Sequence, residues 1–68
     1  MKPLTAKQVE EILSANGFVC KSSVGSHFGW YNPETRRRTI VAHHGNRVLP
    51  QGTLNAIFNQ AGLPKPQR

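Results

Sequence analysis

The sequence has little cysteine and little acid, and each shortage excludes a class of site. Its 68 residues include a single cysteine, Cys20, and three acidic side chains. One thiol can neither close an internal disulfide nor complete a cysteine-based zinc site, and this fits a reducing cytoplasm. Three carboxylates are too few to favour a carboxylate-bound magnesium ion. We therefore expect a protein that uses no metal and no cofactor.

Long apolar runs are also missing. No stretch approaches the roughly 20 apolar residues of a membrane span, and the early lysine, Lys2, is not followed by an apolar segment of signal-peptide length. A chain of 68 residues has room for one small domain with a modest core. We expect a soluble, cytoplasmic protein without a membrane partner. A monomer is favoured for the free chain.

What the sequence has in excess is positive charge. Nine lysines and arginines against three acidic residues give a formal net charge of +6. Such an excess on a small surface is typical of proteins that bind a polyanion, and we favour a nucleic acid as that partner. The alternatives are a protein that is merely cationic and a basic face that meets an acidic protein.

The first part of the hydrophobic pattern predicts a helix followed by three short strands. Thr5 and Gln8 have the spacing of a capping box, and Asn16-Gly17 is a typical helix end, after which Phe18 can fold back onto the last turn. Beyond it, short runs rich in β-branched and aromatic residues are separated by turn residues. Strands are expected over residues 18–22, 26–31 and 38–42.

The last part of the pattern predicts a second helix, from about Pro50 to Gly62. Its apolar stripe consists of Leu54, Ile57, Phe58 and Ala61. Three consecutive strands with short turns favour an antiparallel meander, and each helix needs an apolar surface. The predicted fold is therefore α+β: one domain over residues 1–63, with both helices on one face of the sheet. Residues 64–68 are expected to be a flexible basic tail, because their prolines oppose regular structure.

Alternation along the second strand separates a core face from an open face. Phe28 and Trp30 share one face and are expected to pack in the core, while His27 and Tyr31 share the other face. Tyr31 is the better candidate for stacking on a base. By the same reasoning we expect Cys20 to be a small core residue. Glu10 is expected on the side of the first helix that faces water.

His27 is the candidate catalytic residue. Histidine can both take and give a proton near neutral pH, and Gly25 before it would let a nucleic-acid backbone approach closely. We expect His27 to abstract the 2′-hydroxyl proton of RNA, so that the oxygen attacks the adjacent phosphate. The alternative is an exposed histidine without a role.

Four cationic side chains are candidate phosphate contacts. Arg36, Arg37 and Arg38 follow the turn after the second strand, where guanidinium groups can clamp phosphates through two parallel hydrogen bonds. A solvated hairpin is the alternative interpretation of this cluster. Lys21 is expected near the same end of the sheet as His27. The adjacent His43 and His44 would point to opposite sides of a strand, which does not favour a shared metal ion.

In their order and spacing these motifs resemble those of the HicA family, the mRNA interferase toxins of prokaryotic HicA/HicB pairs. The matching segments are Asn16-Gly17-Phe18, Gly25-Ser26-His27, the arginine hairpin around Pro33, His43-His44-Gly45, and the run from Gly52 to Leu63. Together they span nearly the whole chain.

The resemblance implies a double-stranded-RNA-binding-domain-like fold, ribosome-independent cleavage of mRNA, and neutralisation by a HicB antitoxin that covers the active site. It implies that His27 is catalytic. We expect Gly25 and Ser26, next to it, to contact the RNA. Many members carry an arginine where this chain has Ser22. The expected function is therefore a metal-independent endoribonuclease toxin of a type II toxin–antitoxin system. The alternative is a non-catalytic RNA-binding module of the same fold.

Overall fold

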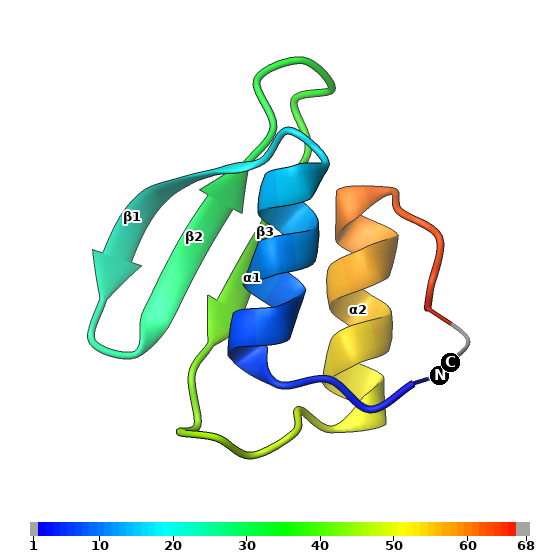
Figure 1. Cartoon of the computed structure of the whole chain (residues 1–68). Helices are drawn as coiled ribbons and strands as arrows, with labels where there is room; N and C mark the ends of the chain where they lie inside the picture. Colours follow the sequence, from blue (N-terminus) through cyan, green and yellow to red (C-terminus); the bar gives the residue numbers. More distant parts are fainter. Residues whose placement is uncertain (1, 67–68) are drawn as a thin grey trace.

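The computed structural model describes residues 2–66 and shows the expected order of helix, three strands and helix. The elements are α1 (Ala6–Ala15), β1 (Val19–Val24), β2 (His27–Tyr31), β3 (Arg38–Ala42) and α2 (Gln51–Ala61). Both helices lie side by side against the sheet in Figure 1. The predicted α+β layout is confirmed, while the likeness to a double-stranded-RNA-binding domain stays a prediction.

The sheet is an antiparallel meander in the order β1-β2-β3. His27, at the start of β2, pairs with Val24 of β1 and with Ala42 of β3. Tyr31, at the other end of β2, pairs with Arg38. The β1–β2 ladder shifts register between Cys20 and Ser22, as in a β-bulge.

The ends of α1 follow from local chemistry. The Thr5 hydroxyl accepts a hydrogen bond from the Gln8 backbone N–H, and the Gln8 side chain accepts one from the Thr5 N–H, which completes the predicted capping box. At the other end, the Phe18 N–H donates to the Leu13 carbonyl at 3.0 Å. This closing bond satisfies a carbonyl that the helix itself leaves unpaired.

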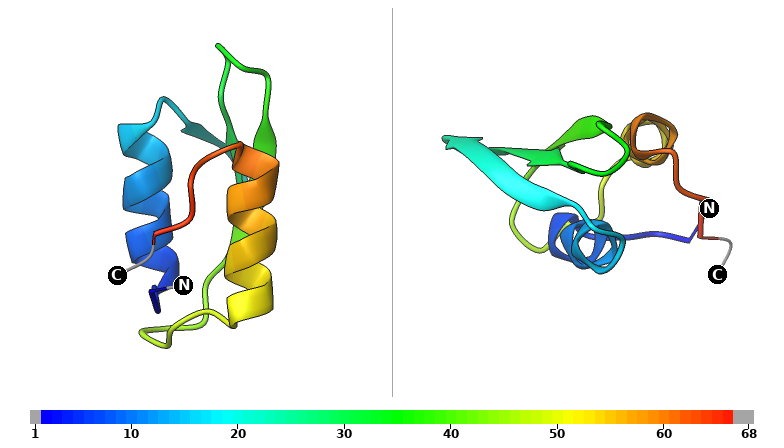
Figure 2. Two further views of the ribbon diagram at one scale, coloured as in Figure 1. Left: turned by 90° about the vertical axis from the view of Figure 1, so that its right-hand side faces the viewer. Right: turned by 90° about the horizontal axis from the view of Figure 1, so that it is seen from above.

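The core lies between the two helices and β3. The predicted stripe of α2 is buried throughout: Leu54, Ile57, Phe58 and Ala61. It packs with Val9 and Leu13 of α1 and with Val41 of β3 in one hydrophobic cluster. Figure 2 shows α2 beside the β3 end of the sheet, with β1 at the far end. The two helices therefore bury their apolar residues mainly against β3.

Strand β1 has no helix over it, and every one of its residues is exposed. The expectation that Cys20 is a core residue is therefore wrong. Cys20 pairs with Trp30, whose side chain packs against the core, but Cys20 itself is exposed and its thiol donates to the Ser22 carbonyl at 3.6 Å. The alternation of residues along β1 predicts which side of the strand Cys20 occupies, but it does not show that both helices lie nearer to β3.

Gly62 ends α2 in the left-handed conformation, with φ of 69°, and the Leu63 N–H donates to the Phe58 carbonyl. A Cβ at Gly62 would lie 2.5 Å from Nε of Arg37. We expect Gly62→Ala to lower the free energy of unfolding by about 1–2 kcal/mol for the backbone alone, with a small further loss as the exposed Arg37 side chain leaves the end of α2. Denaturant unfolding measures the loss.

Gly45→Ala is the matched control, because Gly45 has φ of 65° and open space around its missing Cβ. Gly45→Ala should cost only the backbone term. Equal losses in the two variants would contradict a close contact between Arg37 and the end of α2.

The expected tail begins after Leu63. The described residues 64–66 run back to the N-terminal segment: the Lys2 N–H donates to the Pro66 carbonyl, and Lys65 Nζ donates to Asn59 Oδ1. Residues 67 and 68, the rest of that tail, lie outside the described residues. Within residues 2–66, neither helix has the length and apolar character needed to cross a membrane.

Candidate active site

His27 lies at the tip of the β1–β2 hairpin, directly after a two-residue turn formed by Gly25 and Ser26. Gly25 has φ of 59° and nothing within 4 Å of the position of its missing Cβ, so the approach to the turn is open. His27 is exposed, and no hydrogen bond holds its ring among the described residues. The imidazole is therefore accessible to a large ligand.

The turn is tied to the segment that follows β3. The His43 N–H donates to the Ser26 carbonyl at 2.9 Å, which extends the β2–β3 pairing past the His27–Ala42 pair. The fold thus brings the Gly-Ser-His turn beside His43 and His44, which the sequence left as separate motifs.

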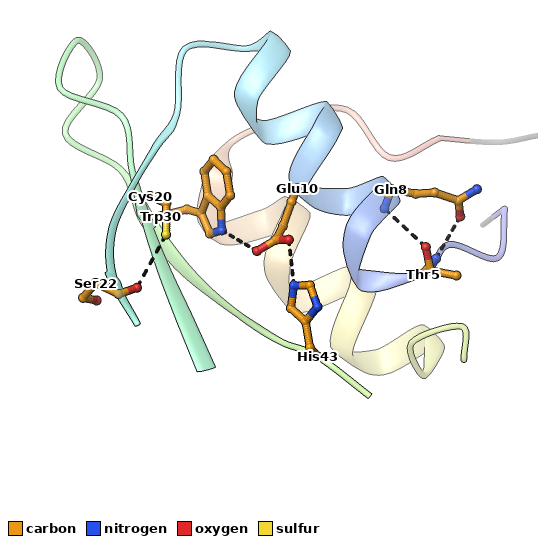
Figure 3. A network of polar contacts seen from close by, with 7 residues as sticks. All are labelled: Thr5, Gln8, Glu10, Cys20, Ser22, Trp30 and His43. Carbon is orange, nitrogen blue, oxygen red and sulfur yellow. Dashed lines mark hydrogen bonds and ion pairs between the residues drawn. The ribbon is translucent and has the colours of Figure 1, made fainter. Parts of the chain in front are cut away.

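Glu10 of α1 joins this segment to the sheet, as Figure 3 shows. Its carboxylate accepts one hydrogen bond from Trp30 Nε1 at 2.9 Å and another from His43 Nε2 at 2.7 Å. A carboxylate only accepts, so Nε2 of His43 carries the proton in this contact. The expectation that Glu10 faces water is wrong, because Trp30 and His43 both bond its carboxylate; the Glu10 side chain is only 16% exposed.

The two downstream histidines have different surroundings. The His43 ring also packs against the Phe28 ring, with centroids 4.7 Å apart and the planes inclined at 58°. His43 therefore fixes the segment after β3 against α1 and β2. His44, the next residue, is exposed, so it is the histidine of this pair that solvent and ligands can reach.

The arginine cluster lies at the opposite end of the sheet from His27. Arg38 pairs with Tyr31, and Arg36 and Arg37 precede it in the β2–β3 connection. Tyr31 is four residue steps along extended β2 from His27, about 13 Å at the usual rise of a strand. The structure therefore does not place the three arginines beside the candidate catalytic residue.

Arg37 is engaged at the end of α2. Its guanidinium lies against Gly62, and Nη1 lies 3.5 Å from the Gln60 carbonyl. A cation at a helix C-terminus is favourable, because unpaired carbonyls give that end a partial negative charge. Arg38 instead lies over the Tyr31 ring, with its guanidinium carbon 5.8 Å from the centroid. Of these two arginines, Arg38 is the one that shares a face of the sheet with Tyr31.

Lys21 is not at the His27 end of the sheet, so that expectation is wrong. It lies in the irregular step of β1 between Cys20, which pairs with Trp30, and Ser22, which pairs with Gly29. The register shift carries Lys21 into the same groove as Arg38 and Tyr31. Short-range sequence patterns do not reveal such a shift.

Side chains that can bind metals do not gather elsewhere in the described part of the chain. Within residues 2–66, no three His, Cys, Asp or Glu side chains are grouped so that they could hold a metal ion. Sequence reasoning missed Glu10 as a site-supporting residue. Its contacts join α1 to β2 and to the segment after β3, and the hydrophobic periodicity of the sequence does not reveal such contacts.

Comparison with known proteins assigns the chain to a family. No curated protein matches it. The model of a protein family described as HicA toxin of bacterial toxin–antitoxin matches residues 6–63, a range that includes both helices, the sheet and the Gly25-Ser26-His27 turn. This chain belongs to the HicA family of bacterial toxins.

Proposed function

We propose that this protein is a metal-independent endoribonuclease that acts as the toxin of a type II toxin–antitoxin pair and cleaves mRNA in the cytoplasm. The observation that carries the proposal is the position of His27, exposed at an open hairpin turn in a family of toxins, on a chain of net charge +6. The charge supplies the attraction for a polyanion. The imidazole supplies proton transfer.

In the proposed reaction His27 takes the proton from a ribose 2′-hydroxyl. The 2′-oxygen then forms a bond to the adjacent phosphorus, and the bond from phosphorus to the 5′-oxygen of the next nucleotide breaks. The departing 5′-oxygen takes a proton from a general acid, for which water and the exposed His44 are the candidates. The products are a 2′,3′-cyclic phosphate and a 5′-hydroxyl.

Cationic side chains and the turn would hold the RNA for this step. We assign Gly25 and Ser26 to close backbone contact, and Lys21, Arg36 and Arg38 to phosphates along the sheet. Arg37 is the least available of the proposed contacts, because its guanidinium already lies at the end of α2. An antitoxin of the HicB type is the proposed protein partner, and it would act by covering His27.

The test uses an RNA with one mapped cleavage site and the same RNA with a single 2′-deoxynucleotide at that site. The deoxy substitution removes the attacking oxygen and leaves the phosphate unchanged. We expect the wild-type protein to cut the first RNA and to leave the second intact at that position. Equal cutting of both would exclude the 2′-oxygen as the nucleophile.

A non-catalytic RNA-binding module is the second candidate function. It is favoured by one observation: among residues 2–66 no side chain orients the His27 ring by a hydrogen bond, whereas catalytic histidines are commonly held by a third group. Binding of both RNAs without cleavage of either would support this alternative and reject the nuclease.

A further inference from the structure

The open face of the sheet and one side of α2 form a groove, which we call the open-face groove. Its lining includes Lys21, Tyr31, Arg38, Ile40, Thr53 and Gln60. Its volume of about 1090 Å³ is at the upper end of pockets that hold a small ligand. A short stretch of a polymer therefore fits it.

Part of the groove lining, namely Gly29, Tyr31, Arg38 and Ile40, shares a face of the sheet with His27, while Trp30 and Thr39 reach the groove from the other face. Alternation along β2 puts His27, Gly29 and Tyr31 on one side, opposite to Trp30, whose indole N–H bonds Glu10 of α1. Ala42, Ile40 and Arg38 stand beside them on β3. A ligand laid along β2 can therefore contact His27 at one end and Tyr31 at the other.

The surface between these two ends is low, and it combines an apolar side chain with a hydroxyl. Gly29 has no side chain, and a Cβ added there would lie 2.5 Å from Oγ of Ser22, so the paired Ser22 hydroxyl already covers that position. Ile40, opposite Gly29, is 62% exposed. An exposed isoleucine beside a serine hydroxyl offers an apolar surface to a base and a hydrogen-bonding group to a sugar.

Charge in the groove is of one sign. Lys21 and Arg38 line it, and among residues 2–66 no acidic side chain does. The Arg38 guanidinium lies 5.8 Å from the Tyr31 centroid, close to the outer limit of about 6 Å for a cation–π contact. Because this contact is loose, the guanidinium can turn to a phosphate while the ring accepts a base.

We propose that the open-face groove is a track for single-stranded RNA, with a base stacked on Tyr31 and phosphates held by Arg38 and Lys21. The proposal rests on the proposed function for its substrate. An aromatic ring beside cations matches a single strand, which offers base faces and phosphates together. An acidic protein would match only the cations.

The geometry also sets where the contact falls relative to the cut. His27 and Tyr31 are about 13 Å apart along β2, which leaves room for more than one nucleotide of an extended single strand between them. The Tyr31 contact therefore lies more than one nucleotide to one side of the scissile phosphate, so it contributes to affinity and not to proton transfer.

The test measures binding of a short, fully 2′-O-methylated oligoribonucleotide, which cannot react through its 2′-oxygen. We expect Tyr31→Leu to weaken binding by about 5- to 100-fold, the usual effect of removing an aromatic stacking partner. Tyr31→Phe should bind as the wild type does. Arg38→Gln and Lys21→Gln should each lower the slope of log affinity against log salt by about 0.7.

Lys7→Gln is the matched control, because it removes the same charge from an exposed position on α1 outside the groove lining. It should leave the salt slope unchanged. Equal slopes for Lys7→Gln and Lys21→Gln, or wild-type affinity in both Tyr31→Leu and Arg38→Gln, would overturn the track. Arg38 is exposed, so its variant tests the proposal even where Tyr31→Leu lowers stability.

The experiments distinguish an error in the proposed RNA-binding groove from an error in the proposed nuclease function. With cleavable RNA, Tyr31→Leu should raise KM more than it lowers kcat. If Tyr31→Leu still cuts RNA with a normal KM, the groove is not an RNA-binding site, and the nuclease proposal stands. If the protein never cuts RNA but its binding of the oligonucleotide depends on Tyr31, the nuclease proposal fails and the groove proposal stands. Loss of affinity for a protein antitoxin with RNA affinity intact would reassign the groove to protein docking and overturn the proposal.

Discussion

Replacing His27 by alanine is expected to lower the rate of RNA cleavage by about 100- to 10,000-fold, the range that positioned proton transfer supplies. His27 is exposed, and its ring holds no other described side chain in place, so its loss should leave the fold and the groove intact. RNA binding should therefore stay within error of the wild type. Single-turnover cleavage and binding to the same RNA measure the two effects separately.

Val24→Ala is the control for this variant. Val24 pairs with His27 across the hairpin and is 77% exposed, so truncating it perturbs the same hairpin without removing a proton-transfer group. Cleavage by Val24→Ala should remain close to that of the wild type. Equal rates for the two variants would show that His27 is not the general base.

Replacing Glu10 by alanine is expected to lower the free energy of unfolding by about 2 kcal/mol. The change removes the acceptor of two hydrogen bonds, from Trp30 Nε1 and His43 Nε2. Bonds to a charged acceptor are worth about 1.5–3 kcal/mol each when buried; water replaces part of this here, because the His43 side chain is 34% exposed. For a domain of this size the loss corresponds to a fall in Tm of about 10 °C.

Glu11→Ala is the matched control, since Glu11 is the next residue on α1 and is exposed. Thermal unfolding of both variants gives the comparison, and the NMR resonance of the Trp30 indole N–H reports the broken contact directly. That resonance should shift in Glu10→Ala and not in Glu11→Ala. Equal stability of the two variants would contradict a structural role for the Glu10 carboxylate.

Local chemistry made much of the fold predictable. The capping box at Thr5 and Gln8, and the left-handed glycine that ends α2, depend on residues within one helical turn. The apolar stripe of α2 has the helical period and is buried throughout. The bounds of β3 agree with the predicted 38–42, because β-branched residues stand between clear turn signals.

The errors on Cys20 and Glu10 concern contacts between distant elements. Cys20 has the parity of a core residue, but the helices pack nearer to β3 and leave β1 uncovered. Glu10 has the spacing of a water-facing residue, yet Trp30 and His43 come to it from the sheet and from the segment beyond it. Periodicity reports which side of an element a residue occupies and not what covers that side.

The candidate site was predictable in its residue types and less so in its arrangement. His27 and its open turn follow from Gly25-Ser26-His27, and the register places Tyr31 on the same face as expected. The grouping of Lys21 with Arg38 depends on the irregular step in β1, and the engagement of Arg37 depends on how α2 docks. Neither feature has a signal within a short stretch of sequence.

The most direct test of the account is the chemistry of the ends that the wild-type protein leaves on RNA cut in EDTA. General-base attack by the 2′-oxygen predicts cleavage without free metal, with a 2′,3′-cyclic phosphate on one fragment and a 5′-hydroxyl on the other. Cleavage that stops in EDTA, or fragments that carry 5′-phosphates, would contradict the role assigned to His27.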